Sequence, residues 1–181
     1  MLSAQTLYSM NIVLLGYMGC GKSTIGRRLA ERLKLRFFDL DELIEAQEGQ
    51  QISELFASKG ELYFRKTEAA VLRCFVAEHD NCVLAPGGGT PCYANNMDFL
   101  LGQRQIKTVY LKAQLKTLVE RVRDQKEQRP LISSLNESEL TEFIAKHLFE
   151  RRYYYEKAGL HYPVEAHGIE QSVIALEQQL F

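Results

Sequence analysis

A glycine-rich run near the N-terminus contains the residues whose spacing most directly implies chemistry. Residues 16–23 read Gly-Tyr-Met-Gly-Cys-Gly-Lys-Ser, a full match to the phosphate-loop pattern G-x-x-x-x-G-K-[ST]. Glycines let the backbone point N–H groups at phosphate oxygens, and a helix starting near Lys22 would add its positive dipole end. Lys22 is expected against the β- and γ-phosphates, and the Ser23 hydroxyl on Mg²⁺. The nucleotide-binding residues that we predict here are Gly19, Cys20, Gly21, Lys22, Ser23 and Thr24.

A phosphate loop alone does not distinguish a GTPase, an ATPase and a kinase. The sequence has no Asn-Lys-x-Asp motif for guanine, and no apolar strand that ends in the Asp-Glu pair of motor ATPases. It has instead Pro86 followed by Gly87, Gly88 and Gly89, directly after a short apolar run. Glycines at the carboxyl end of a strand allow a ligand to approach the backbone. We interpret this turn as substrate-binding, with a merely flexible turn as the alternative.

A pair of acidic residues two positions apart, Asp39 and Asp41, follows a second short apolar run. We expect this segment to be extended and the two carboxylates to have separate roles. One would lie near the metal, and the other would face a substrate hydroxyl. A helix N-terminus that is simply rich in acidic residues is the alternative.

Two arginines have spacings that also bear on function. Arg65 and Glu68 lie three positions apart in a predicted helix, where they are neighbours, although an exposed ion pair is the ordinary interpretation. Arg129 lies in a polar stretch, residues 124–138, that is typical of a closing lid; a surface loop is the alternative. An arginine delivered by such a lid would neutralise charge on the transferred phosphoryl group.

Regular alternation of apolar patterns indicates the elements that position these residues. Short apolar runs predict strands at Asn11–Leu15, Arg36–Phe38, Val83–Ala85, Ile106–Leu111 and His161–Val164. Helical spacing is found after the phosphate loop (Ile25, Leu29, Leu33), at Ile52–Phe56, Glu61–Val76 and Ala113–Arg123, near Phe143, Ile144 and Leu148 behind a cap of Asn136 and Glu139, and from Ile169 to Leu180. We therefore predict a three-layer α/β/α fold around a five-stranded parallel sheet, the nucleoside-triphosphate-binding fold of phosphate-loop proteins.

Length and composition limit the classes of protein to consider. The 181 residues predict a single domain, residues 1–181, in which residues 39–70 bind the acceptor. The formal net charge of -1 gives no sign of a nucleic-acid partner, and no apolar run is long enough to span a membrane. The four cysteines lack metal-ligand spacing, and the first residues do not resemble a signal peptide. We expect a cytoplasmic protein without membrane or nucleic-acid partners.

Nearly the whole chain resembles the shikimate kinase family. The resemblance is carried by Gly16-x-x-Gly-x-Gly-Lys-Ser-Thr-x-Gly26, Phe38-Asp-x-Asp41-x-x-Ile-Glu45, Ile52-Ser-Glu-Leu-Phe56, Gly60-Glu-x-x-Phe-Arg65-x-x-Glu68, Gly87-Gly-Gly89, Arg129-Pro-Leu131, and Glu150-Arg151 with Tyr155. Many phosphate-loop kinases share the first motif, whereas the later motifs in this order are much more specific. The resemblance implies Mg²⁺-dependent transfer of the ATP γ-phosphoryl group to the 3-hydroxyl of shikimate, a step of aromatic amino-acid biosynthesis.

The family pattern also implies roles on the acceptor side. Arg65 and Arg151 would hold the shikimate carboxylate, with Glu68 orienting Arg65. Asp41 would hold the hydroxyls and act as the base toward the accepting oxygen. The backbone of the glycine turn, Gly87, Gly88 and Gly89, would contribute to the same site.

Roles on the nucleotide side follow from the same resemblance. Lys22 and Arg129 would neutralise charge on the γ-phosphoryl oxygens, so Arg129 counts as both a catalytic and an ATP-binding residue. Asp39 would act on Mg²⁺ together with Ser23. Either Arg121 or Arg123 would lie near the adenine, and the spacing leaves the choice open.

Two positions depart from the family pattern, and other functions stay open at this point. Pro86 replaces a small residue before the glycines, which removes one backbone N–H, and Tyr153 stands where a proline is common, so the helix there is expected to continue. The alternatives are a kinase for another polyol acid such as gluconate, a nucleoside monophosphate kinase, or a non-catalytic nucleotide-binding relative. The family suggests a monomer.

Overall fold

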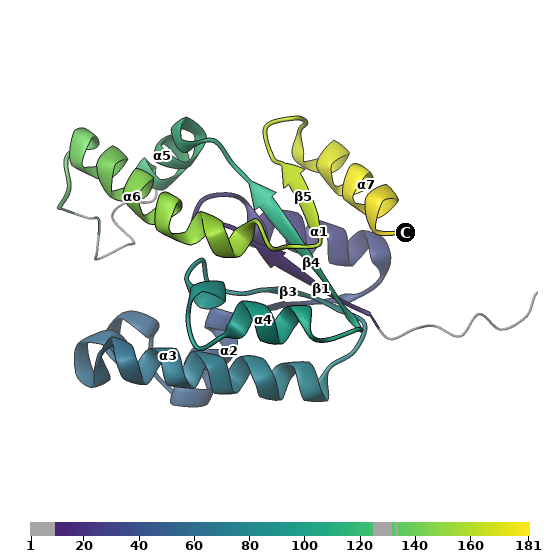
Figure 1. Ribbon diagram of the computed structural model, residues 1–181, viewed down its shortest axis with the longest axis horizontal. Helices are drawn as coiled ribbons and strands as arrows, with labels where there is room; N and C mark the ends of the chain where they lie inside the picture. The colour runs from purple at the N-terminus through teal and green to yellow at the C-terminus, as the bar shows by residue number, and fades with distance from the viewer. Residues whose placement is uncertain (1–9, 125–131, 133) are drawn as a thin grey trace, which may run out of the picture.

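Five parallel strands form one central sheet in the computed structural model, which describes residues 10–124, 132 and 134–181 (Figure 1). The strand order is β2-β3-β1-β4-β5, so the phosphate-loop strand β1 lies in the middle. In this register Val13 of β1 pairs with Leu84 on one side and Thr108 on the other. The strands are β1 (Asn11–Leu15), β2 (Arg36–Asp39), β3 (Cys82–Ala85), β4 (Ile106–Lys112) and β5 (Leu160–Pro163).

Helices surround this sheet and are joined to it by short connections. Their bounds are α1 (Lys22–Leu33), α2 (Leu40–Glu48), α3 (Ile52–Glu78), η1 (Thr90–Cys92, a 3₁₀ turn), α4 (Asn96–Leu101), α5 (Leu115–Arg123), α6 (Glu137–Tyr155) and α7 (Ile169–Leu180). Helices α1 and α7 pack against each other, α5 packs against α6, and α2 packs against α3.

Strand β2 shows why the fold has three layers. Successive side chains of a strand point to opposite faces of the sheet. Phe37 accordingly lies against Gly26 of α1, while Phe38 packs edge-on against Phe75 of α3, with ring centroids 5.0 Å apart. Because both faces carry aromatic side chains, the sheet needs a helix on each side to remove them from water.

The predicted α/β fold is confirmed, and the differences are local. Extended structure was expected through Asp41, but α2 begins at Leu40 because the Asp39 side chain caps it by accepting a hydrogen bond from the backbone N–H of Asp41 (3.1 Å). The short elements η1 and α4 were not predicted. The two predicted segments at Ile52–Phe56 and Glu61–Val76 are joined as α3, which is kinked at Gly60 (φ 79°, ψ 169°).

The parallel arrangement brings the chemically interesting segments to one edge of the sheet. The phosphate loop follows β1, Asp39 ends β2, and the glycine turn follows β3. Carboxyl ends of parallel strands meet at one edge, where such sheets bind ligands. Among the described residues, no helix combines the length and apolarity required to cross a bilayer.

Candidate active site

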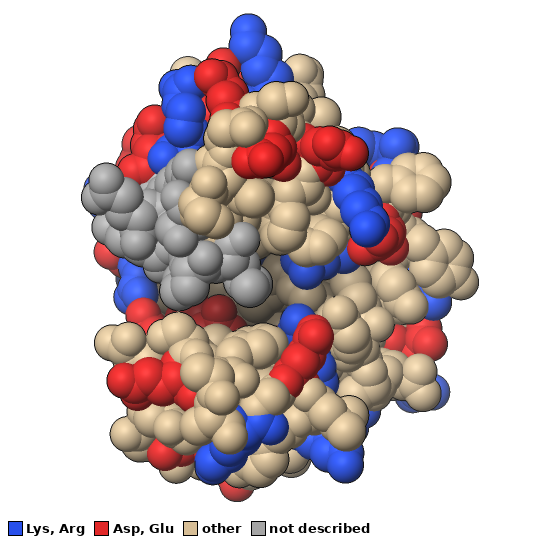
Figure 2. Space-filling view, turned by 90° about the vertical axis from the view of Figure 1, so that its left-hand side faces the viewer, with Lys and Arg blue, Asp and Glu red and all other residues tan. Residues whose placement is uncertain are grey.

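A cavity of about 750 Å³ lies at this edge of the sheet. Figure 2 shows the molecular surface hollowed between an upper and a lower part, with basic and acidic side chains in the hollow. Residues of the phosphate loop, of the Asp39–Glu45 segment, of the glycine turn and of the β5–α7 connection line the cavity. Among the predicted site residues, the lining contains Gly19, Cys20, Gly21, Lys22, Ser23, Thr24, Asp39, Asp41, Gly87 and Gly88.

The phosphate loop needs its glycines for their backbone angles. Gly16, Gly19 and Gly21 have φ values of 145°, 80° and 103°, in the region that L-residues with side chains avoid. Gly21 also precedes the first turn of α1, whose N-terminus has no side-chain cap. The N–H groups of that turn therefore remain available for an anion. The Lys22 ammonium donates to the carbonyl oxygens of Gly16 (2.8 Å) and Tyr17 (3.2 Å), which keeps it folded over the loop.

Ser23 and Asp39 form the pair predicted for the metal. The Ser23 hydroxyl donates to Oδ2 of Asp39 (3.0 Å), which brings together two hard oxygen donors from α1 and β2. In the described part of the chain, no group of three or more His, Cys, Asp or Glu side chains could hold a metal ion. The two oxygens of Ser23 and Asp39 fit Mg²⁺, which usually takes one or two protein oxygens and completes its shell with water and substrate phosphates.

Asp41 is a carboxylate whose pKa is raised by its surroundings. Burial, followed by the nearby charges of Asp39 and Glu68, raises its pKa to about 6, although Lys22 acts in the opposite direction. A carboxylate of this kind is a better proton acceptor near neutral pH than an exposed one. Because it lines the same cavity as the phosphate loop and interacts with the charge of Lys22, Asp41 is suitable as a general base.

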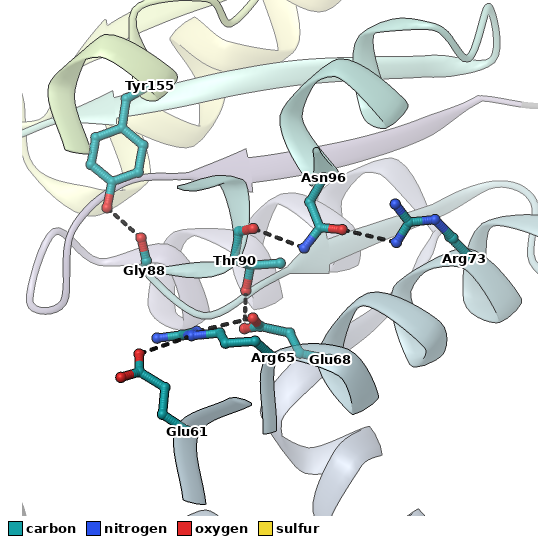
Figure 3. A network of polar contacts seen from close by, with 8 residues as sticks. All are labelled: Glu61, Arg65, Glu68, Arg73, Gly88, Thr90, Asn96 and Tyr155. Atoms are coloured by element: carbon teal, nitrogen blue, oxygen red, sulfur yellow. Dashed lines mark hydrogen bonds and ion pairs between the residues drawn. The ribbon is translucent and has the colours of Figure 1, made fainter. Parts of the chain in front are cut away.

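Arg65 and Glu68 form an ion pair that is largely buried, and not exposed as their spacing ordinarily suggests. Nη1 of Arg65 donates to Oε2 of Glu68 (2.9 Å), and the Glu68 side chain is 1% exposed (Figure 3). The Arg65 guanidinium also lies 4.1 Å from the centre of the Tyr93 ring. Glu68 therefore orients Arg65, as the resemblance implied.

Arg151 approaches the same turn from the opposite side. Its Nη1 atom lies 3.6 Å from the point that a Cβ atom on Gly88 would occupy, and its guanidinium lies 5.4 Å from the centre of the Tyr17 ring. Helix α6 continues through Tyr153, as expected at a position without proline, and the Tyr153 side chain faces solvent. The substitution at this position therefore leaves Arg151 directed toward the site.

The glycine turn is needed for space and not for backbone freedom. Gly87, Gly88 and Gly89 all have negative φ values, which residues with side chains also adopt. A Cβ atom on Gly87 would lie 3.1 Å from Oδ1 of Asp41, and one on Gly89 would lie 2.9 Å from Nη2 of Arg65. A side chain at these positions would displace Asp41 or Arg65, so the turn requires small residues for lack of space.

The structure distinguishes Arg121 from Arg123 and adds one lining segment that the sequence did not predict. Arg121 donates through Nη1 to the carbonyl oxygens of Gly19 (3.2 Å) and Cys20 (3.4 Å), whereas Arg123 pairs with Asp124 and Glu137 away from the loop. The β5–α7 connection adds Val164, His167, Gly168, Ile169 and Ser172 to the lining. The signal for this segment was its position after a strand of a parallel sheet. The predicted lid residue Arg129 lies outside the described residues.

A phosphate loop on the central strand, an adjacent hydroxyl–carboxylate pair and a partly buried aspartate in the same cavity define a phosphate-loop kinase for a small molecule. A family model described as shikimate kinase matches residues 18–179. A shikimate kinase of Flavobacterium johnsoniae is 46% identical over 162 residues, which cover 90% of this chain and 94% of that protein. The chain therefore belongs to the shikimate kinase family.

Solved structures of the family superpose on most of the chain. The shikimate kinase of Bacteroides thetaiotaomicron matches with a TM-score of 0.88 at 37% identity, covering 94% of this chain and 98% of the other. A shikimate kinase of Acinetobacter baumannii, in complex with shikimate, gives a TM-score of 0.80 at 32% identity and covers 95% of this chain and 93% of its own.

Proposed function

We propose that the chain transfers the γ-phosphoryl group of ATP to the 3-hydroxyl of shikimate. The observation that carries this proposal is the position of Asp41 between the phosphate loop and a glycine turn flanked by two arginines. Shikimate combines one carboxylate with three hydroxyls, so a site for it requires cationic forks beside a hydroxyl-binding carboxylate. The family and the solved structures named above support the same reaction.

Two arginines on different helices are assigned to the carboxylate. Arg65 comes from α3 and Arg151 from α6, and both guanidinium groups lie against the glycine turn. A guanidinium donates two parallel hydrogen bonds to a carboxylate, which fixes the orientation as well as the position of the acceptor. The backbone of Gly87, Gly88 and Gly89 then forms the wall against which the ring lies.

Asp41 is assigned the proton of the accepting hydroxyl. Its pKa of about 6 leaves it ionised at neutral pH but more basic than an exposed aspartate. The carboxylate would orient the 3-hydroxyl toward the phosphate loop and accept its proton as the new P–O bond forms. Holding both reactants in line is expected to provide most of the rate enhancement.

Lys22 and the Ser23–Asp39 pair are assigned to the nucleotide. Lys22 would leave its carbonyl partners to contact the β- and γ-phosphates, and Ser23 and Asp39 would hold Mg²⁺, Asp39 directly or through water. Mg²⁺ bound there would neutralise negative charge on the phosphates. Arg121, which lies on the loop, is preferred to Arg123 for the adenine side. Arg129 keeps its proposed role at the γ-phosphoryl group on the family motif alone.

An assay that follows ADP release across several acceptors tests this function. With Mg²⁺ and ATP, shikimate should support turnover, whereas quinate, gluconate and nucleoside monophosphates should give rates lower by about 100-fold or more. Lys22→Ala should reduce turnover with shikimate by roughly 100-fold or more, because charge compensation at the phosphates is lost, and should retain the fold by circular dichroism. A faster rate with any other acceptor would contradict the assignment.

We propose a monomeric enzyme, as the resemblance to the family suggests. Sedimentation at the assay concentration checks this. A dimer whose dissociation removes activity would show that a second copy completes the site.

A further inference from the structure

Thr90, the residue after the glycine turn, has a buried hydroxyl that is linked to Arg65 through the carboxylate of Glu68. Its Oγ1 donates to Oε1 of Glu68 (2.6 Å), while the other oxygen of that carboxylate accepts from Arg65 (Figure 3). Thr90 and Glu68 are 0% and 1% exposed. A buried carboxylate needs partners for both oxygens. Thr90 therefore completes the set of contacts that holds Glu68, and through it Arg65, in one orientation.

Asn96 fixes Thr90 in turn. Its Nδ2 donates to the carbonyl oxygen of Thr90 (2.9 Å), and its Oδ1 accepts from Nη1 of Arg73 (3.0 Å), a residue of α3 (Figure 3). Arg73 also donates to the carbonyl oxygens of Ala69 and Ala94. The Thr90 end of the turn is thus joined at two residues to α3, the helix that carries Arg65. Glu68 bonds Thr90 directly, and Arg73 bonds Asn96.

The turn is also joined to α6, through Tyr155. The Tyr155 hydroxyl donates to the carbonyl oxygen of Gly88 (2.5 Å), and its ring is fully buried against Tyr110, with centroids 5.1 Å apart. Burial raises the pKa of this phenol well above its usual value, so the hydroxyl keeps its proton and donates. Tyr155 lies one turn of α6 after Arg151, which interacts with the same hydroxyl.

These contacts connect the two arginines that flank the turn. The three glycines have no side chains of their own, so the distance from Arg65 to Arg151 depends on what holds the turn at each side. We propose that the Thr90–Glu68 and Tyr155–Gly88 hydrogen bonds set the separation of the two guanidinium groups, which makes Thr90 and Tyr155 positioning residues for the carboxylate of the acceptor. This inference rests on the proposed function, because it assigns how the same site recognises shikimate.

The physical reason is the narrow geometry of two-point carboxylate recognition. Two guanidinium groups bind one carboxylate well only when both forks meet it in the correct relative position. A displacement of about 1 Å at such a site can cost roughly 100-fold. Neither Thr90 nor Tyr155 is assigned a contact with ATP, so their loss should affect the acceptor selectively.

Two variants remove the hydroxyl groups with little change of shape: Thr90→Val and Tyr155→Phe. Each should raise KM for shikimate about tenfold and leave kcat and KM for ATP within about twofold, since the phosphate loop and Asp41 are untouched. Thr90→Ser restores the donor and should return KM for shikimate to the wild-type range. Tyr110→Phe removes a hydroxyl from the ring that packs against Tyr155 and serves as the matched control, with unchanged KM.

A shikimate analogue whose carboxylate is replaced by hydroxymethyl separates positioning from general damage. The wild-type enzyme should use this analogue poorly, and Thr90→Val and Tyr155→Phe should use it no worse than the wild type does. An equal rise in KM for both acceptors, or no rise for shikimate, would overturn the inference while leaving the reaction itself established. A wild-type enzyme that does not phosphorylate shikimate would instead overturn the proposed function.

Discussion

At the scale of single residues, Asp41 shows how surroundings change an ordinary side chain. The carboxylate lies among Asp39, Glu68 and Lys22, and burial is the largest cause of its raised pKa. A raised carboxyl pKa means that the folded protein holds the proton more tightly than the unfolded chain. As pH rises from 3.8 to about 6, the unfolded chain loses this proton first, so the free energy of unfolding falls.

Asp41→Asn should therefore stabilise the free protein while removing catalysis. At pH 8 without Mg²⁺, its free energy of unfolding should exceed the wild-type value by roughly 2 kcal/mol, a figure reduced for the partial exposure of the group. The difference should disappear below pH 4, where both states of the wild-type protein are protonated. Turnover should fall by about 100-fold or more. Urea titrations across pH and the ADP-release assay measure the two effects.

A neighbouring carboxylate provides the control for this stability difference. Glu42 is exposed and pairs with Arg27, so Glu42→Gln should show no comparable gain at pH 8. Equal stability of Asp41→Asn and the wild type at pH 8 would show that the surroundings do not raise the pKa of this carboxylate.

At the scale of elements, the active site is built at junctions where a strand ends. The Asp39 cap places α2 directly after β2, and the glycine turn passes between Asp41 and Arg65 after β3. The glycine turn tolerates small residues only, because groups from other elements approach its backbone closely. Helix α6 is determined more locally, since its predicted capping box forms between Asn136 and Glu139.

Gly89→Ala tests the requirement for space at the glycine turn. The added methyl group would lie 2.9 Å from Nη2 and 3.0 Å from Nη1 of Arg65, so the guanidinium must move. We expect KM for shikimate to rise about tenfold or more and KM for ATP to stay within about twofold. Steady-state kinetics with each substrate varied in turn measure this selectivity.

Gly159→Ala is the matched control for this substitution. A Cβ atom there would lie 3.8 Å from its nearest neighbours on Thr108, which is ordinary contact. It should leave both KM values unchanged. If Gly89→Ala behaves in the same way, the glycines are not required to make room for Arg65.

At the scale of the whole molecule, the cavity divides between two sets of elements. The phosphate loop and the β5–α7 connection form one part, and the Asp39–Glu45 segment with the glycine turn forms the other. Arg65 of α3 and Arg151 of α6 lie against the glycine turn, outside the residues that line the cavity itself. Figure 1 shows α3 and α6 on either side of this region, and Figure 2 shows the hollow between them. The central position of β1 in the sheet places the phosphate loop between these parts. Transfer between two bound substrates requires this arrangement, in which each ligand has its own walls and the reacting atoms meet at the middle.

Hydrogen exchange should separate the two parts. A non-hydrolysable ATP analogue with Mg²⁺ should slow exchange in residues 16–24 and 164–172 by about tenfold, and shikimate should do so in residues 61–73 and 87–96. In Arg65→Lys, which keeps the charge but loses the planar fork, protection by shikimate should decrease while protection by the nucleotide persists. Protection of the same peptides by both ligands would contradict the division of the cavity.

Local pattern was sufficient for most elements and for the phosphate loop. Strands β1 and β3 are short and buried at every position, β4 is buried from Thr108 to Leu111, and the glycines of the loop are required by their own φ values. Elements η1 and α4 were not predicted, and a helix start at α2 was only the alternative, because these starts depend on contacts such as the Asp39 cap. Such local signals are weak in sequence because a capping residue is also an ordinary loop residue.

The sequence by itself determined the α/β class, the nucleotide site and the set of residues suited to a hydroxy-acid acceptor. Only the tertiary structure decided that Arg65 and Glu68 form a buried pair and that Arg121, not Arg123, reaches the phosphate loop. It also showed that the glycine turn has no space for side chains. Each of these depends on the distance between segments far apart in the chain. Spacing along one helix or strand reports which residues share a face, whereas burial, pKa shifts and steric limits arise from what the other elements place opposite that face.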